Sequence, residues 1–308
     1  MSIDPSPNRH RGRRLFLAGM AFLVSACAAH GAVIAPEPAR PRPATDMAHR
    51  PQLPSTPSPV AAVPSGLAAD FAQLRSEFPG QMGLAVMAVG GDRAVTLGDW
   101  HAGVAWSTIK VPLALAALRR DPVGQADLAT AAITESDNDA AQALWISLGG
   151  GKPAAEAVEA VLREAGDTTT DVADRHNPDS AATIDHPMVF GATQWSLGDQ
   201  VEFASRLPCL QQASRVLGLM RRITDEQRWG LGSFVGAEFK GGWGPDDDTG
   251  AYLLRQFGII PTWSGGLAIA LAAHPDSGDY DDAITMMDRM AAVVARHVHE
   301  LHGGECRP

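Results

Sequence analysis

The sequence predicts one α/β domain of the α+β kind: an antiparallel sheet flanked by helices, built from both chain ends, with an inserted all-helical subdomain. Two observations predict it. Short apolar runs bounded by glycine lie in 67–105 and 224–303, whereas 106–223 is rich in alanine and has helical periodicity. The chain of 308 residues has room for one large domain with a substantial core, or for two small ones.

The first 27 residues have the pattern of an export signal. Basic residues, including the twin-arginine-like pair Arg13-Arg14, precede an apolar run over 15–24 that is too short for a stable membrane span. Small residues then lead to Cys27, which is typical of a lipoprotein signal whose cysteine is lipidated. An ordinary secretory peptide with an incidental cysteine is the alternative. We expect an exported protein, anchored by lipid on Cys27 to the outer face of the cell membrane within the cell envelope.

Residues 28–66 are predicted to be a disordered, proline-rich tether. Nine of the 22 prolines fall within 35–65, among serine, threonine and alanine, and this composition cannot bury a core. At about 3.1 Å per residue, roughly 30 residues would span on the order of 90 Å. A lipid anchor with such a spacer suits a domain that works out in the cell wall.

The charge divides at the same boundary. Residues 1–66 carry seven arginines against three acidic residues, so the remaining 242 residues hold −14 of a total formal charge of −10. An acidic domain without a basic stripe argues against a nucleic-acid partner. We expect the domain, 67–303, to act as a monomer.

The expected elements follow the chain in order. The first sheet part comprises a helix over 67–77 and a hairpin over 83–89 and 94–97. Helices are predicted from Ser107 onward and over 126–133, 139–148, 154–165, 197–206 and 213–223, with a long loop over 167–191. Strand-like runs over 237–242, 252–260 and 266–273 and a closing helix over 284–301 complete the domain.

Ser107 and Lys110 stand at the head of the apolar run 111–118. Positions i and i+3 share a helix face, so the amine can reach the hydroxyl. A partly desolvated lysine with a lowered pKa can remove the proton that keeps serine a poor nucleophile. The spacing also occurs by chance at plain helix starts, so this pair alone does not establish catalysis.

Two further motifs follow in sequence. Ser136-Asp137-Asn138 falls at a turn between two helices, and Lys240-Gly241-Gly242 falls on a predicted strand. Together with Ser107-x-x-Lys110, they resemble the motif set of class A β-lactamases and penicillin-binding proteins. The resemblance covers roughly 67–303 and implies a β-lactamase-like fold.

The resemblance also implies roles for the site residues. Ser107 is the nucleophile, Lys110 its base, and Ser136 relays a proton to the leaving nitrogen. Asn138 holds Lys110 and a substrate amide. The backbone N–H groups of Ser107 and Trp243 form the oxyanion hole.

The remaining substrate-binding positions follow from the same resemblance. Lys240 lowers local pKa values and attracts a substrate carboxylate, and Gly242 lies on the same strand beside the substrate. Arg255, on the neighbouring strand, can share that carboxylate; the alternative is a solvated strand arginine.

Three departures from the family pattern concern turnover. The loop 167–191 contains no glutamate to activate a deacylating water, only the five aspartates Asp167, Asp171, Asp174, Asp179 and Asp185. Gly241 replaces a hydroxyl residue that would donate to the carboxylate. Ser107 and Ser136 are only 29 positions apart, which predicts a more open cleft.

These observations predict an exported serine hydrolase that acts through a Ser107 acyl-enzyme on a β-lactam or a peptidoglycan-derived amide. The alternatives are a catalytically impaired penicillin- or peptidoglycan-binding lipoprotein, and a D,D-peptidase or esterase. We expect no cofactor and no metal, since the histidines at 297, 299 and 302 lack the H-E-x-x-H spacing. A disulfide between Cys209 and Cys306 is left open, because sequence cannot show that their Cα atoms are close.

Overall fold

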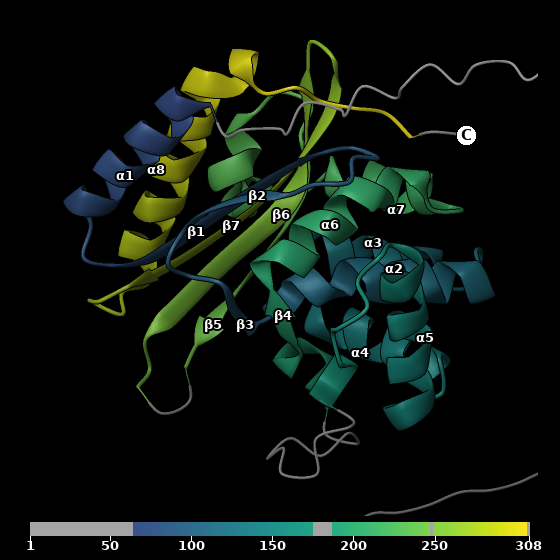
Figure 1. Ribbon diagram of the computed structural model, residues 1–308. Helices are drawn as coiled ribbons and strands as arrows, with labels where there is room; N and C mark the ends of the chain where they lie inside the picture. Colours follow the sequence, from purple (N-terminus) through teal and green to yellow (C-terminus); the bar gives the residue numbers. More distant parts are fainter. Residues whose placement is uncertain (1–63, 175–186, 247–248, 307–308) are drawn as a thin grey trace, which may run out of the picture. The chain divides into compact units, whose positions relative to one another are not determined.

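The computed structural model describes residues 64–174, 187–246 and 249–306 (Figure 1). The predicted export signal, the lipidated Cys27 and almost all of the tether lie outside the described residues. Within the described ranges, no helix is both long and apolar enough to cross a membrane.

A five-stranded antiparallel sheet forms the centre of the domain. Its strands, in spatial order, are β2 (Val95–Gly98), β1 (Gly80–Ala88), β7 (Gly265–Pro275), β6 (Tyr252–Thr262) and β5 (Glu238–Pro245). The first two strands and the last three come from opposite ends of the domain, which confirms the prediction that both chain ends build the sheet. β5 is an edge strand and contributes the Lys240 motif.

Helices cover both faces of the sheet, as Figure 1 shows. One face carries α1 (Ser65–Glu77) beside α8 (Tyr280–His297), and the other carries α6 (Leu197–Arg206) with the rest of the helical part. Since neither face of the central strands meets solvent, β6 and β7 are runs of buried residues without polar alternation.

The outer helix pair is joined by both apolar and charged contacts. α1 buries Leu67, Phe71 and Leu74, the apolar positions that the helical period predicted. Arg296 and His297 of α8 both contact the carboxylate of Asp70 on α1, at 3.0 Å.

The helical part consists of α2 (Lys110–Arg120), α3 (Ala126–Thr134), α4 (Asn138–Ser147), α5 (Gly151–Glu164) and α7 (Ala213–Met220). These ranges match the predicted helices to within three residues at each end. Asp137 caps α4, because its carboxylate accepts the N–H of Ala140 at 2.6 Å. The turn before α4 is therefore held in place at the point where Ser136 lies.

A second, two-stranded sheet was not predicted. β3 (Ala102–Val104) pairs with β4 (Gln194–Ser196) and so ties the segment before the nucleophile turn to the segment that follows the long loop. Each strand has three residues, which is too short for an alternating pattern to stand out in the sequence.

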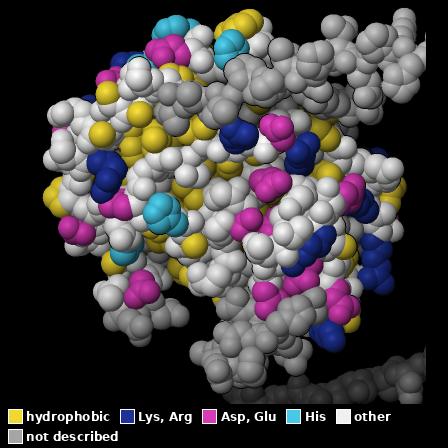
Figure 2. Space-filling view, viewed as in Figure 1, with side chains coloured by type: hydrophobic (Ala, Val, Ile, Leu, Met, Phe, Trp, Pro, Cys, Tyr) yellow, Lys and Arg dark blue, Asp and Glu magenta, His cyan; other side chains and the backbone are white. Residues whose placement is uncertain are grey.

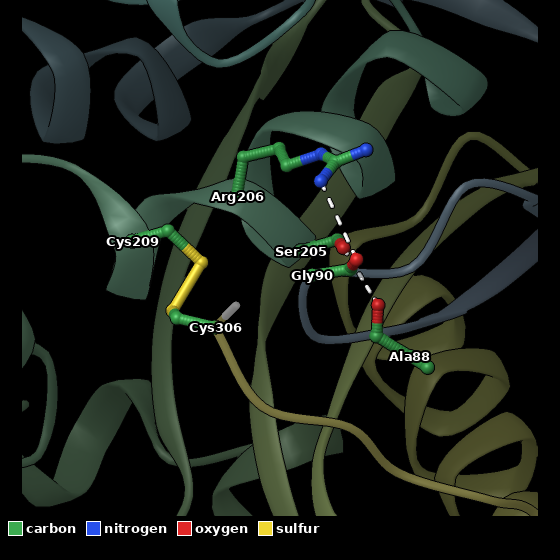
Figure 3. Close-up of a disulfide and its surroundings, with 6 residues drawn as sticks. All are labelled: Ala88, Gly90, Ser205, Arg206, Cys209 and Cys306. Carbon is green, nitrogen blue, oxygen red and sulfur yellow. Dashed lines mark hydrogen bonds between the residues drawn. A yellow bond between two sulfur atoms is a disulfide. The ribbon is translucent and has the colours of Figure 1, made fainter. Parts of the chain in front are cut away.

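The C-terminal segment is fastened by the disulfide that sequence left open. Cys209 and Cys306 are bonded, with their Cα atoms 5.3 Å apart (Figure 3). The same figure shows Ser205, whose hydroxyl donates to the carbonyl of Ala88 at 2.7 Å. The hydrogen bond holds the end of α6 against the end of β1, and the disulfide holds the last described residues against the turn that follows α6.

Candidate active site

The predicted nucleophile lies on a tight turn in front of the sheet. Residues Trp106–Ile109 form a 3₁₀ turn, and the α-helix begins only at Lys110. The expectation that Ser107 opens the α-helix itself is therefore wrong by one turn. Trp106 has φ +49°, a left-handed conformation that a bulky residue seldom adopts and that is often found at functional sites.

Lys110 comes from α2 and reaches the turn between α3 and α4. Its side chain is buried, and Nζ donates to the carbonyl of Ser136 and to Oδ1 of Asn138, each at 2.6 Å. Burial lowers the pKa of Lys110 to about 8, while the Asp137 carboxylate acts in the opposite direction. The predicted association of Lys110, Ser136 and Asn138 is thus present.

Lys240 approaches the same serine from β5. Its Nζ donates to Ser136 Oγ at 2.9 Å and to the carbonyl of Gly241 at 2.8 Å. Complete burial, and then the charge of Lys110, hold the pKa of Lys240 well below its usual range. The Ser136 hydroxyl therefore lies between two lysine amines, with Lys110 Nζ 3.5 Å from it.

Ser136 is held in an unusual backbone conformation. Its φ is +62°, in the left-handed region, although it is not glycine. The Asp137 cap on one side and the amines of Lys110 and Lys240 on the other restrain it there. Such conformations persist only where surrounding contacts enforce them.

Gly242 lets β5 approach the nucleophile. A Cβ at this position would lie 2.8 Å from the backbone nitrogen of Ser107 and 2.9 Å from that of Thr108, closer than real contacts allow. Only glycine permits this approach, which brings the Ser107 N–H next to the edge strand that carries Trp243.

The nucleophile and its expected base are not directly bonded. Among the hydrogen bonds of the described residues, none joins Ser107 Oγ to Lys110 Nζ. Lys110 Nζ donates to the carbonyl of Ser136 and to Oδ1 of Asn138. If Lys110 is neutral, these two bonds use both of its N–H groups, and its lone pair is left to accept the proton of Ser107. Catalytic hydrogen bonds often tighten only when substrate is bound.

Solved structures of class A β-lactamases resemble this chain over three quarters of its length. The TLA-3 extended-spectrum β-lactamase matches with a TM-score of 0.61 and 15% identity, over 76% of this chain and 99% of its own. A class A β-lactamase from Mycobacterium abscessus matches with a TM-score of 0.56 and 17% identity, over 75% and 98%. An ancestral (GNCA) class A β-lactamase matches with a TM-score of 0.56 and 21% identity, over 75% and 99%.

This chain has the class A β-lactamase fold. No protein-family model matches the sequence, and no curated protein matches it either. The fold therefore rests on the three-dimensional likeness, and the site has to be judged on its own contacts.

Within this β-lactamase fold, Gly241 is covered by an indole ring. A Cβ at this position would lie 3.0 Å from two ring carbons of Trp229. Trp229 in turn packs edge-on against Trp243, with ring centroids 6.2 Å apart. The sequence showed that a hydroxyl is missing at 241, but it contained no signal for the tryptophan, which lies twelve positions earlier.

The prediction that Arg255 binds a substrate carboxylate is wrong, and so is its alternative as a solvated arginine. Arg255 is fully buried. Its guanidinium donates to the carbonyls of Gly103 and Trp195 and to the side chain of Gln200, and it is therefore occupied inside the protein. Arg255 stands opposite Gly242 on the sheet, but its side chain extends under the nucleophile turn, where a substrate has no access.

Asp167 does not take the place of the absent glutamate. Asp167 is fully buried, and its carboxylate accepts hydrogen bonds from the backbone N–H groups of Thr169 and Thr170 and from the Trp195 indole. A carboxylate held this way orders the start of the loop and does not activate water. Asp171 has a partner of its own. The side chain of Asp174 and all of Asp179 and Asp185 lie outside the described residues.

Among the tail histidines, His297 joins α8 to α1. His297 contacts Asp70 at 3.0 Å and Glu300 at 2.8 Å. Across 64–174, 187–246 and 249–306, no group of three histidine, cysteine or acidic side chains is placed to hold a metal ion.

Proposed function

We propose that this protein is a β-lactamase-like serine hydrolase that forms an acyl-enzyme on Ser107. The contact that supports this most is the Ser136 hydroxyl between the amines of Lys110 and Lys240, next to the nucleophile turn. A plain helix start would leave both lysines in solvent, because burying two ammonium groups side by side is costly. The proposed substrate is a β-lactam or a related cell-wall amide.

Acylation would proceed by attack of Ser107 Oγ on the acyl carbonyl carbon. The Oγ–C bond forms as the Oγ–H proton passes to the lone pair of neutral Lys110, and the carbonyl becomes an oxyanion. The Ser107 N–H, beside β5, and the Trp243 N–H are the proposed donors to this oxyanion.

Collapse of the tetrahedral intermediate breaks the C–N bond. The leaving nitrogen needs a proton, and the Ser136 hydroxyl is the proposed donor. Lys240, which donates to Ser136 Oγ, and Lys110 can restore that proton. In total, one proton moves from Ser107 to the leaving amine by way of Lys110 and Ser136, and the acyl group is transferred to Ser107 Oγ.

A second candidate is a protein that binds penicillin or peptidoglycan without fast turnover. The observation that favours it is the buried, fully bonded Asp167, which leaves deacylation without an identified base in the described loop. A D,D-peptidase or esterase activity would use the same acylation steps.

The proposed location is the outer face of the cell membrane, to which a lipid on Cys27 would anchor the protein.

The protein without its leader can be incubated with a penicillin and with a chromogenic cephalosporin, with intact mass and absorbance followed in parallel. We expect an adduct of the β-lactam mass on the protein and none on Ser107→Ala. A stable adduct without turnover selects the penicillin-binding candidate, and turnover selects the hydrolase. If the unaltered protein gives neither adduct nor turnover, the proposal is wrong for these substrates.

A further inference from the structure

A buried cation underlies the nucleophile turn. Arg255 is completely buried, and among the described residues no carboxylate pairs with it. Its Nη1 lies within hydrogen-bond distance of the carbonyls of Gly103, Val104 and Trp195, at 2.8, 3.2 and 3.1 Å. Arg255 thus joins β6 to both strands of the small β3–β4 sheet.

A chain of hydrogen bonds runs from Arg255 to Thr108, the residue after the nucleophile. Arg255 Nη2 donates to Gln200 Oε1 at 2.9 Å, and Gln200 Nε2 donates to Thr108 Oγ1 at 3.0 Å. The Thr108 hydroxyl donates onward to the carbonyl of Ala105 at 2.5 Å. Arg255, Gln200, Thr108 and Ala105 have no solvent exposure.

Each end of this chain of hydrogen bonds is fixed. Ala105 N–H donates to the carbonyl of Thr193 at 2.7 Å, which anchors the start of the nucleophile turn to the residue before β4. On the other side, the guanidinium lies over the Trp100 ring, 5.0 Å from its centroid. Ser107 is therefore enclosed between Ala105 and Thr108, two residues whose positions the network sets.

Stability alone does not account for this arrangement. Burying a guanidinium without a carboxylate partner carries a large desolvation cost, and that burial lowers the pKa of Arg255 to about 9. Buried ionic groups can often be replaced by apolar residues of similar volume without loss of stability. A well-packed apolar side chain, however, could not orient the amide of Gln200.

We propose that Arg255, acting through Gln200, is a positioning residue that sets the geometry of the turn around Ser107 for acylation. This inference rests on the proposed serine acyl-enzyme. The network keeps the Ser107 N–H beside β5 and keeps Oγ at one place relative to Lys110. A displacement near 1 Å of a reacting group can cost about 100-fold in rate.

Gln200→Glu tests the network with little change in shape. The carboxylate still accepts from Arg255 but has no N–H for Thr108. Thr108→Val removes the hydroxyl at nearly constant volume, while Thr108→Ser retains it. We expect Gln200→Glu and Thr108→Val to slow acylation by about 10- to 100-fold with little change in KM, and Thr108→Ser to restore it.

Val158→Ala is the matched control, since it removes buried volume from α5 and lowers stability without touching the turn. Its acylation rate at a temperature well below unfolding should equal that of the unaltered protein. If Gln200→Glu and Thr108→Val also acylate at the unaltered rate, the inference is wrong. It is equally wrong if Val158→Ala loses as much acylation rate as they do for the same loss of stability.

Amide hydrogen exchange gives a readout that does not require activity. We expect the amides of Ser107 and Thr108 to exchange faster in Gln200→Glu and Thr108→Val, and at the unaltered rate in Thr108→Ser. Unchanged exchange in the first two variants would overturn the inference. No adduct on the unaltered protein, with exchange shifted as expected, would instead overturn the proposed function and leave the network as the support of the turn.

Discussion

At the scale of single residues, Ser136 and the two lysines that meet it determine the charge of the site. Burial disfavours the protonated form of both amines, and the charge of Lys110 further disfavours that of Lys240. The site can therefore hold a neutral amine near physiological pH. Ordinary surface lysines could not act as bases there.

The pH dependence of acylation follows from the lowered pKa of Lys110. The base acts when neutral, and a pKa of about 8 leaves about a tenth of Lys110 neutral at pH 7. The acylation rate should therefore rise with pH by about tenfold from pH 7 to a plateau above the pKa. Stopped-flow acylation with a chromogenic cephalosporin between pH 6 and 9 measures this.

Two variants sharpen that measurement. Lys110→Arg stays protonated throughout this range and should acylate very slowly at every pH. Lys152→Met removes an exposed lysine and should leave the profile unchanged. A flat profile for the unaltered protein would contradict the assignment of Lys110 as base.

The contact between Gly241 and Trp229 predicts a steric effect. In Gly241→Thr, the new side chain meets the indole at 3.0 Å, so we expect a loss of about 1–3 kcal/mol in the free energy of unfolding, measured with urea. Trp229→Leu should partly relieve this loss in the double variant. Gly218→Thr on α7 is the control, because beyond the backbone of its own helix and its chain neighbours no atom lies within 4 Å of its added Cβ. Equal losses at 241 and 218 would show that the indole is not the cause.

At the scale of elements, the site lies where four pieces of backbone converge: the nucleophile turn, α2, the turn before α4, and edge strand β5. Gly242 permits the closest approach, and Arg255 braces the turn from beneath. Since β5 pairs with β6 on one side only, its other edge can approach the nucleophile turn.

The C-terminal segment depends on its disulfide. The double variant Cys209→Ser, Cys306→Ser opens a loop whose ends are 97 positions apart, so we expect a loss of about 2–4 kcal/mol in unfolding free energy. Urea unfolding of the variant and of the reduced unaltered protein should agree. An unchanged free energy in both would show that the segment contributes nothing through this bond.

At the scale of the whole molecule, charged residues are distributed unevenly along the chain but are mixed on the surface of the domain. On the face seen in Figure 2, acidic and basic side chains are interspersed over the described surface. The acidic excess of 67–308 and the basic excess of 1–66 are properties of the sequence. They fit the proposed export and tethering of the domain.

Anchorage can be tested directly. Cys27→Ala removes the proposed lipidation site, so the protein should move from the membrane fraction to the soluble fraction, and the mass of a diacylated N-terminus should disappear. Cys209→Ser should stay with the membrane. If Cys27→Ala remains membrane-bound, the proposed anchor is wrong.

Local sequence patterns predict most of the helices and strands. The helical period identified α1 and α8, and glycine-bounded apolar runs identified β1, β5, β6 and β7. β3 and β4 were missed because three-residue strands carry no period. The sequence predicts α-helix at Ser107, since a single 3₁₀ turn is too short for its period to be distinguished from the first turn of an α-helix.

The sequence by itself determined the order of the motifs and the residue types for an acyl transfer: Ser107, Lys110, Ser136, Asn138 and Lys240. Only the tertiary structure decided which side chains meet. It buried Arg255 against Gly103, 152 positions away, and it placed the Trp229 indole over Gly241. It also buried the Asp167 carboxylate in hydrogen bonds, so that this group is not available as a base. The physical reason is that spacing along the chain sets the local conformation, whereas burial and pairing depend on contacts between distant segments.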